Sequence, residues 1–114
     1  MARSVEEMRE EIIADLTIEF QAHPTFSEDV LAIKVDDAIA EVRERRHYEN
    51  TSMSEDRIEA DLLNFARNIK NLARFDYHQI GAFGESYHYE GGTNRTWVAR
   101  EKFLDGVTAF ARLV

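Results

Sequence analysis

Apolar residues recur every three or four positions along three stretches of this chain, residues 5–20, 31–42 and 58–73. This spacing places them on one side of a helix, and such a helix must bury that side against another element. In chain order, the three stripes consist of Val5, Met8, Ile12, Leu16 and Phe20; Leu31, Val35, Ala38, Ile39 and Val42; and Ile58, Leu62, Phe65, Ala66, Ile69, Leu72 and Ala73. The chain is therefore predicted to be mainly α, a small bundle of about four helices.

Serine residues stand where these three helices should begin. Ser4 is followed three residues later by a glutamate, which is the spacing of a capping box, and Ser27 precedes the second stripe. The third helix has two possible starts, at Ser52 within a second capping box or at Ser54 alone. We expect this third helix to run without interruption to about Tyr77.

A short last helix is predicted after residue 100. Phe103, Val107, Phe110 and Val114 repeat there at helical spacing, although a glycine interrupts them and weakens the helix. The length of 114 residues suits one domain that spans 1–114.

The composition argues against several functional classes. The chain has no cysteine, which excludes disulfides and thiolate metal sites, and no apolar run long enough for a signal peptide or a membrane span. Its 22 acidic and 14 basic residues give a net charge of −8, whereas duplex-binding proteins usually gather basic charge. Only Arg43, Arg45 and Arg46 are tightly grouped, and Glu41 lies one helical turn from Arg45. We expect no membrane association and no tight DNA binding.

The helical pattern stops in residues 81–97, GAFGESYHYEGGTNRTW, which contain four glycines within twelve residues. Residues 86–90 and 95–98 alternate and carry aromatic and β-branched side chains, and the GGTN between them has turn chemistry. This pattern predicts a glycine-rich β-hairpin or extended loop near residues 85–98.

Several chemical roles for this segment lack the residues that they need. A phosphate cradle would require a P-loop or a dinucleotide fingerprint, and neither is present. His78, His88 and Glu90 are candidate metal ligands, but only the last two share a strand face, which is fewer than a zinc site needs. Acid–base catalysis by the same pair lacks a visible nucleophile or pocket. We therefore predict no catalytic, cofactor-binding or metal-binding residue and no cofactor.

A protein-contact surface is the hypothesis that remains. Tyr, Trp and Arg dominate the energetic centres of protein interfaces, and this segment is rich in them. On the second predicted helix, two apolar residues fall off the main stripe and could form a second contact. The candidate interface residues are Tyr87, His88, Tyr89, Glu90, Arg95 and Trp97 in the segment, and Val30 and Ile33 on the helix.

The order of residues in the segment resembles the head–tail connector (adaptor) proteins of tailed phages. The pattern associated with that family is Gly-Ala-x-Gly-x-Ser-x-His-x-Glu-x-Gly-x-x-Arg-Ser/Thr-Tyr/Trp. This sequence departs from it at Tyr87 and Tyr89, where small polar residues are expected, and at Gly91, where Asn is expected. The matching residues, in order and without a gap, are Gly81, Ala82, Gly84, Ser86, His88, Glu90, Gly92, Arg95, Thr96 and Trp97.

The resemblance implies a structural virion protein and not an enzyme. Such a protein is made in the bacterial host cytoplasm and resides at the head–tail junction of the virion. It assembles as a ring homo-oligomer of about twelve copies beneath the portal protein, and a closed ring follows from head-to-tail contacts. It joins the portal to the next connector or tail protein and extends the channel through which DNA passes. The alternatives are a small helical DNA-packaging accessory or regulatory protein and a metal-binding enzyme that uses His and Glu.

Overall fold

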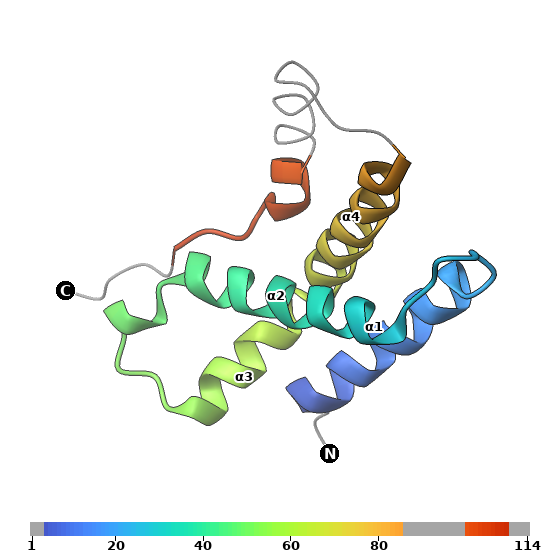
Figure 1. The fold of residues 1–114 in the computed structure, drawn as a ribbon. Helices are drawn as coiled ribbons and strands as arrows, with labels where there is room; N and C mark the ends of the chain where they lie inside the picture. The colour runs from blue at the N-terminus through green and yellow to red at the C-terminus, as the bar shows by residue number, and fades with distance from the viewer. Residues whose placement is uncertain (1–3, 86–99, 110–114) are drawn as a thin grey trace.

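The computed structural model describes residues 4–85 and 100–109, and within these ranges the chain forms four α-helices and no strand (Figure 1). The elements, in order, are α1 (Val5–Phe20), α2 (Glu28–Arg46), the 3-10 helix η1 (Tyr48–Asn50), α3 (Glu55–Leu63), α4 (Ala66–Glu85) and the 3-10 helix η2 (Lys102–Leu104). The prediction of a mainly helical small bundle is confirmed. The predicted hairpin falls almost wholly on residues 86–99, outside the described ranges.

One apolar core joins the four helices. α2 crosses the centre of the bundle and packs against α1 and α4, while α3 packs against α1 and α2 (Figure 1). Leu104 and Val107, which follow α4 in the sequence, are buried together with the helices. The core consists of Met8, Ile12, Ile13, Leu16, Leu31, Val35, Ala38, Val42, Tyr48, Ile58, Leu62, Ile69, Leu72, Ala73, Leu104 and Val107.

The helix starts follow the serine caps. The Ser4 hydroxyl accepts a hydrogen bond from the backbone N–H of Glu7 at 3.0 Å, and the Glu7 carboxylate accepts one from the Ser4 N–H at 3.3 Å. This reciprocal pair is the predicted capping box. Ser27 and Ser54 cap α2 and α3 through their side chains. The third helix therefore uses the second of its two possible starts.

The prediction of one uninterrupted third helix is wrong. α3 ends at Leu63, α4 begins at Ala66, and the two residues between them form a turn. The N–H of Phe65 donates to the carbonyl of Leu62 at 2.9 Å, a bond three residues back that tightens the chain. The apolar spacing continues through the turn, which is why the stripe conceals the break. The turn lets α3 pack on α1 and α2 while α4 packs along α2.

The end of the third predicted helix also differs. α4 continues eight residues beyond Tyr77 to Glu85, through two glycines that were expected to end the helical pattern. The low helix propensity of glycine is only a weak preference, and the rest of the fold overrides it here.

The predicted last helix is wrong within the described residues. The chain is helical at residues 100–104 and then turns at Asp105 and Gly106. Gly106 adopts φ +85°, a left-handed conformation that no helix continues through. Val107 is nevertheless buried, so the apolar spacing marks a segment that lies on the bundle. We call residues 100–109 the strap. Phe110 and Val114 lie outside the described residues.

Tyr48 supplies a spectroscopic test of the packing between α2 and α3. Its hydroxyl donates to the Asp61 carboxylate at 2.5 Å, and Arg46 donates to the same carboxylate at 2.9 Å. Burial, followed by the hydrogen bond to Asp61, raises the pKa of Tyr48 from 10.0 to about 12. Because the folded pKa is the higher one, the stabilisation is complete below pH 10 and is lost as pH rises through 12.

We therefore expect one tyrosine to ionise near pH 12. The measurement is the absorbance at about 295 nm, which reports tyrosinate, during alkaline titration of the wild type and of Tyr48→Phe. Their difference isolates Tyr48. A difference midpoint near the ordinary value of 10 would contradict the buried hydrogen bond.

Candidate functional site

Six of the eight predicted interface residues lie outside the described residues. They are Tyr87, His88, Tyr89, Glu90, Arg95 and Trp97. The other two are on α2, where Val30 is half-buried and Ile33 is 55% exposed. Ile18 on α1 is more exposed still, at 71%, and the sequence analysis did not single it out. This residue lies off the apolar stripe of α1, and that position was the sequence signal that could have identified it as exposed.

The structure describes only one of the three candidate metal ligands. His78 is exposed on α4, while His88 and Glu90 lie outside the described ranges. Among residues 4–85 and 100–109, no group of three or more His, Cys, Asp or Glu side chains is placed to hold a metal ion.

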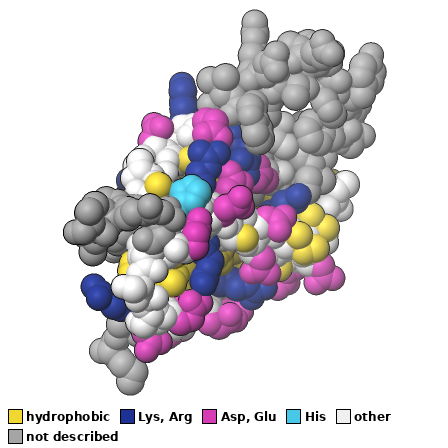
Figure 2. Space-filling model, turned by 90° about the vertical axis from the view of Figure 1, so that its left-hand side faces the viewer, with side chains coloured by type: hydrophobic (Ala, Val, Ile, Leu, Met, Phe, Trp, Pro, Cys, Tyr) yellow, Lys and Arg dark blue, Asp and Glu magenta, His cyan; other side chains and the backbone are white. Residues whose placement is uncertain are grey.

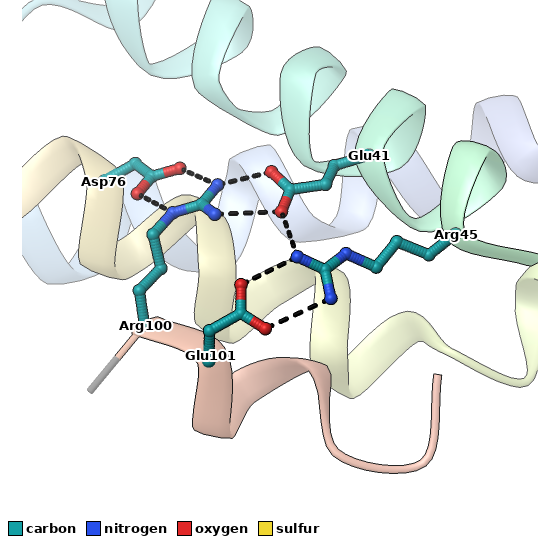
Figure 3. Close-up of polar contacts among 5 residues, drawn as sticks. All are labelled: Glu41, Arg45, Asp76, Arg100 and Glu101. Carbon is teal, nitrogen blue, oxygen red and sulfur yellow. Dashed lines mark hydrogen bonds and ion pairs between the residues drawn. The ribbon is translucent and has the colours of Figure 1, made fainter. Parts of the chain in front are cut away.

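The most organised polar site is a cluster of five charged residues between α2, α4 and the strap, which we call the ionic clamp. Arg100 is its centre, and its side chain is only 12% exposed. Its guanidinium donates two hydrogen bonds to Asp76 on α4, at 2.8 and 2.9 Å, and two to Glu41 on α2, at 2.8 and 2.5 Å (Figure 3). Because one planar guanidinium forms two bidentate pairs, it holds the strap firmly in place against α2 and α4.

A third bidentate pair extends the clamp. Arg45 on α2 donates to Glu101 of the strap at 2.7 and 3.1 Å, and it lies 3.9 Å from Glu41 (Figure 3). The charges alternate in the order Asp76, Arg100, Glu41, Arg45 and Glu101, so each cation lies between two carboxylates. The sequence predicted only the contact between Glu41 and Arg45, which is the longest one in the clamp.

The electrostatics of the clamp favour its charged form. Hydrogen bonds to Asp76 and Glu41 raise the pKa of Arg100, and the hydrogen bond from Arg100 lowers the pKa of Glu41 below its ordinary 4.5. Because the folded pKa of Glu41 is the lower one, its stabilisation is complete above pH 4.5 and is lost as pH falls through the folded value. The clamp is therefore stable at neutral pH and weakens in acid.

The clamp fixes where the chain rejoins the bundle. α4 ends at Glu85, and the strap resumes at Arg100, which is bound to Asp76 nine residues before that end. Nine helical residues span about 13.5 Å. Glu85 and Arg100, which flank the 14 residues 86–99 in the sequence, are thus held in the same part of the bundle.

The grouped arginines of α2 are all paired with carboxylates. Arg43 binds Glu55 and Arg46 binds Asp61, while Arg45 belongs to the clamp. Figure 2 shows basic and acidic side chains interspersed over one face of the molecule. The described basic residues therefore form no unopposed cluster at this helix end.

Comparisons with known proteins do not identify a family for this chain. No protein-family model matches the chain, and neither a curated protein nor a solved structure matches it. Within the described residues, every helix is too short or too polar to cross a membrane.

Proposed function

We propose that this chain is a structural head–tail connector of a tailed phage. One observation carries the proposal: the ungapped agreement of residues 81–97 with the connector pattern. In this role the protein forms a ring of about twelve copies, and a closed ring requires two different contact surfaces on each subunit. It binds the portal protein on one side and the next connector or tail protein on the other. No catalytic step is part of the function.

The anchoring of the segment supports a contact role. The residues on either side of the segment are held by the bundle: Glu85 ends α4, and Arg100 is bound in the ionic clamp. Anchored ends restrict the unbound chain, and a segment restricted in this way loses less conformational entropy when it binds a neighbour. Aromatic and arginine side chains then contribute most of the binding energy.

The charge pattern suits a protein that surrounds DNA without holding it. The chain carries a net charge of −8, and the three grouped arginines of α2 are engaged by Glu55, Asp61 and the clamp. Phosphate contacts require basic side chains that are free to displace counterions. A ring of such subunits repels the DNA backbone and lets it slide.

Replacing both Tyr89 and Trp97 by Ala should abolish or strongly weaken assembly while the melting temperature changes little. We expect at least a tenfold loss of ring formation or portal binding, because two interface anchors of this type commonly contribute about 2 kcal/mol each. Electron microscopy of the purified protein, alone and mixed with portal, measures the rings. Ile18→Ala, which truncates an exposed apolar residue on α1, is the matched control. If the double variant unfolds while its folded fraction still assembles, the two aromatics belong to the core.

We expect duplex DNA to bind weakly or not at all at about 150 mM salt. A mobility-shift assay over increasing salt tests this expectation. Tight binding that falls steeply with salt would contradict the connector proposal. It would favour the alternative of a DNA-packaging accessory protein.

A further inference from the structure

The outer side of α2 is exposed, although apolar residues occur on it. Ile33, which is 55% exposed, and the exposed Ala40 lie on this side seven positions apart, which corresponds to about two helical turns. The core residues Leu31, Val35 and Val42 lie on the opposite side of the same helix. The bundle therefore buries one side of α2 and leaves apolar side chains on the other.

Two carboxylates lie beside these apolar residues. Asp37 and Glu44 are exposed on the same outer side of α2, and they are also seven positions apart. Within residues 4–85 and 100–109, neither of these side chains has a hydrogen-bonding or ionic partner. The neighbouring Asp36, in contrast, is bound by Arg9 of α1. The outer side of α2 thus combines apolar surface with negative charge.

A hollow lies at the C-terminal end of this surface, where α2, η1 and α3 meet (Figure 1). It has a volume of about 440 Å³ and is open to solvent. Tyr48 and Ile58 are almost fully buried and provide apolar surface inside it. Ala40 and Glu44 belong both to the hollow and to the outer side of α2, so the two features are continuous. The lining residues are Ala40, Arg43, Glu44, Tyr48, Glu49 and Ile58.

Carboxylates dominate the charge at the hollow. Glu44 and Glu49 line it, and the one lining cation, Arg43, is held by Glu55 with contacts of 2.6 and 3.0 Å. Glu49 contacts the ring of His47 at 2.9 Å, but its side chain remains 68% exposed. Among the residues that the structure describes, no three acidic or histidine side chains converge as metal ligands. Carboxylates that are spread along a surface suit a series of basic side chains.

We propose that the outer side of α2 and the hollow together bind a basic amphipathic helix of a partner protein. The apolar side of this helix lies on Ile33 and Ala40. Lysine or arginine side chains at seven-residue spacing pair with Asp37 and Glu44. A further basic side chain enters the hollow, where its aliphatic part covers the apolar surface while its charged end reaches Glu49.

The charge of the surface distinguishes this occupant from others. A second copy of the chain would bring a net charge of −8 and the same carboxylates on its own α2. DNA would be repelled for the same reason. Small-molecule sites enclose most of their ligand, and this hollow is open. Only described residues form the surface, so the proposal does not depend on the connector assignment.

Two synthetic peptides test the complementarity. The first is a helix of 19 residues, the length of α2, with leucine and lysine at seven-residue spacing on one side and alanine and glutamine elsewhere. In the second peptide, glutamate replaces every lysine. We expect the lysine peptide to bind with a Kd below about 100 μM in about 150 mM salt, and the glutamate peptide not to bind up to about 1 mM. Fluorescence anisotropy measures both affinities.

Paired substitutions in the protein locate the binding surface. Asp37→Asn together with Glu44→Gln should weaken binding of the lysine peptide about tenfold, because both ion pairs are lost. Glu6→Gln together with Glu10→Gln is the matched control, since it removes the same charge from exposed residues of α1. We expect this control to change the affinity less than about twofold. Amide NMR shifts caused by the peptide should be largest along the outer side of α2 and around the hollow.

Several results would overturn the proposal. Equal losses in the two paired variants, or NMR shifts spread over the whole protein, would show an unspecific attraction of basic peptides to an acidic chain. A lysine peptide that does not bind up to about 1 mM would show that the surface lacks the proposed affinity. Self-association of the protein alone that Ile33→Ala abolishes would make a second copy the occupant.

Discussion

Arg100→Ala should lower the free energy of unfolding by about 3 kcal/mol, because it removes the cation that bridges Asp76 and Glu41. Four hydrogen bonds disappear together, and two partly buried carboxylates lose their main partner, since Glu41 keeps only the longer contact with Arg45. Urea unfolding at neutral pH, followed by circular dichroism, measures the loss. A change below about 0.5 kcal/mol would show that the clamp contributes no more than a surface ion pair.

The pH dependence identifies the cause of the loss. Arg100 holds the pKa of Glu41 below 4.5, so the stabilisation of the wild type by this pair is lost as pH falls through that lower value. The difference in stability between the wild type and Arg100→Ala should therefore narrow in acid. Arg100→Lys is the matched control, because it keeps the charge but cannot form two bidentate pairs. We expect it to lie between the other two proteins at neutral pH.

Leu72→Ala should cost about 3 kcal/mol, which is comparable to the loss of Arg100 but independent of pH. Leu72 is fully buried on α4, the helix that packs along α2 through the bundle. Its truncation removes apolar contacts and leaves a cavity that packed helices refill only in part. Thermal and urea unfolding both report the change.

Ile33→Ala provides the matched control for the core substitution. Ile33 is 55% exposed on α2, and most of its surface is already in water. We expect its truncation to change the free energy of unfolding by less than about 0.5 kcal/mol. A cost similar to that of Leu72→Ala would mean that Ile33 is covered in the protein in solution, as it would be in an assembled ring.

The features of the fold that were predictable are those with local signals. α1 and α2 combine a capping serine with an apolar stripe, and both signals lie within a few residues of the element that they define. The turn at Asn64 and Phe65 has no such signal, because the stripe keeps its spacing through it. Gly106 was recognised as a weak point of the last helix, but the apolar spacing around it gives no sign of the left-handed conformation that it adopts.

The clamp could not be predicted because its contacts are non-local. Arg100 reaches Asp76 across 24 positions and Glu41 across 59, and no periodicity connects residues so far apart. Charged residues are frequent in this chain, so many other pairings were equally compatible with the sequence. The predicted pair of Glu41 and Arg45 exists, but the distance between its two side chains is the longest in the clamp. Local spacing along the helix therefore identified only the weakest contact of the network.

The large sequence separation of the strap contacts has a consequence for the order of folding. Contacts between Arg46 and Thr108, 62 positions apart, require a large loop to close, whereas the helical turns and the packing of α1 on α2 involve shorter loops. The strap is thus expected to dock after the transition state for folding of the helices has passed. Contacts that form this late control the rate of unfolding and have little effect on the rate of folding. The strap is therefore expected to slow the unfolding of the bundle and so to set the lifetime of the folded molecule.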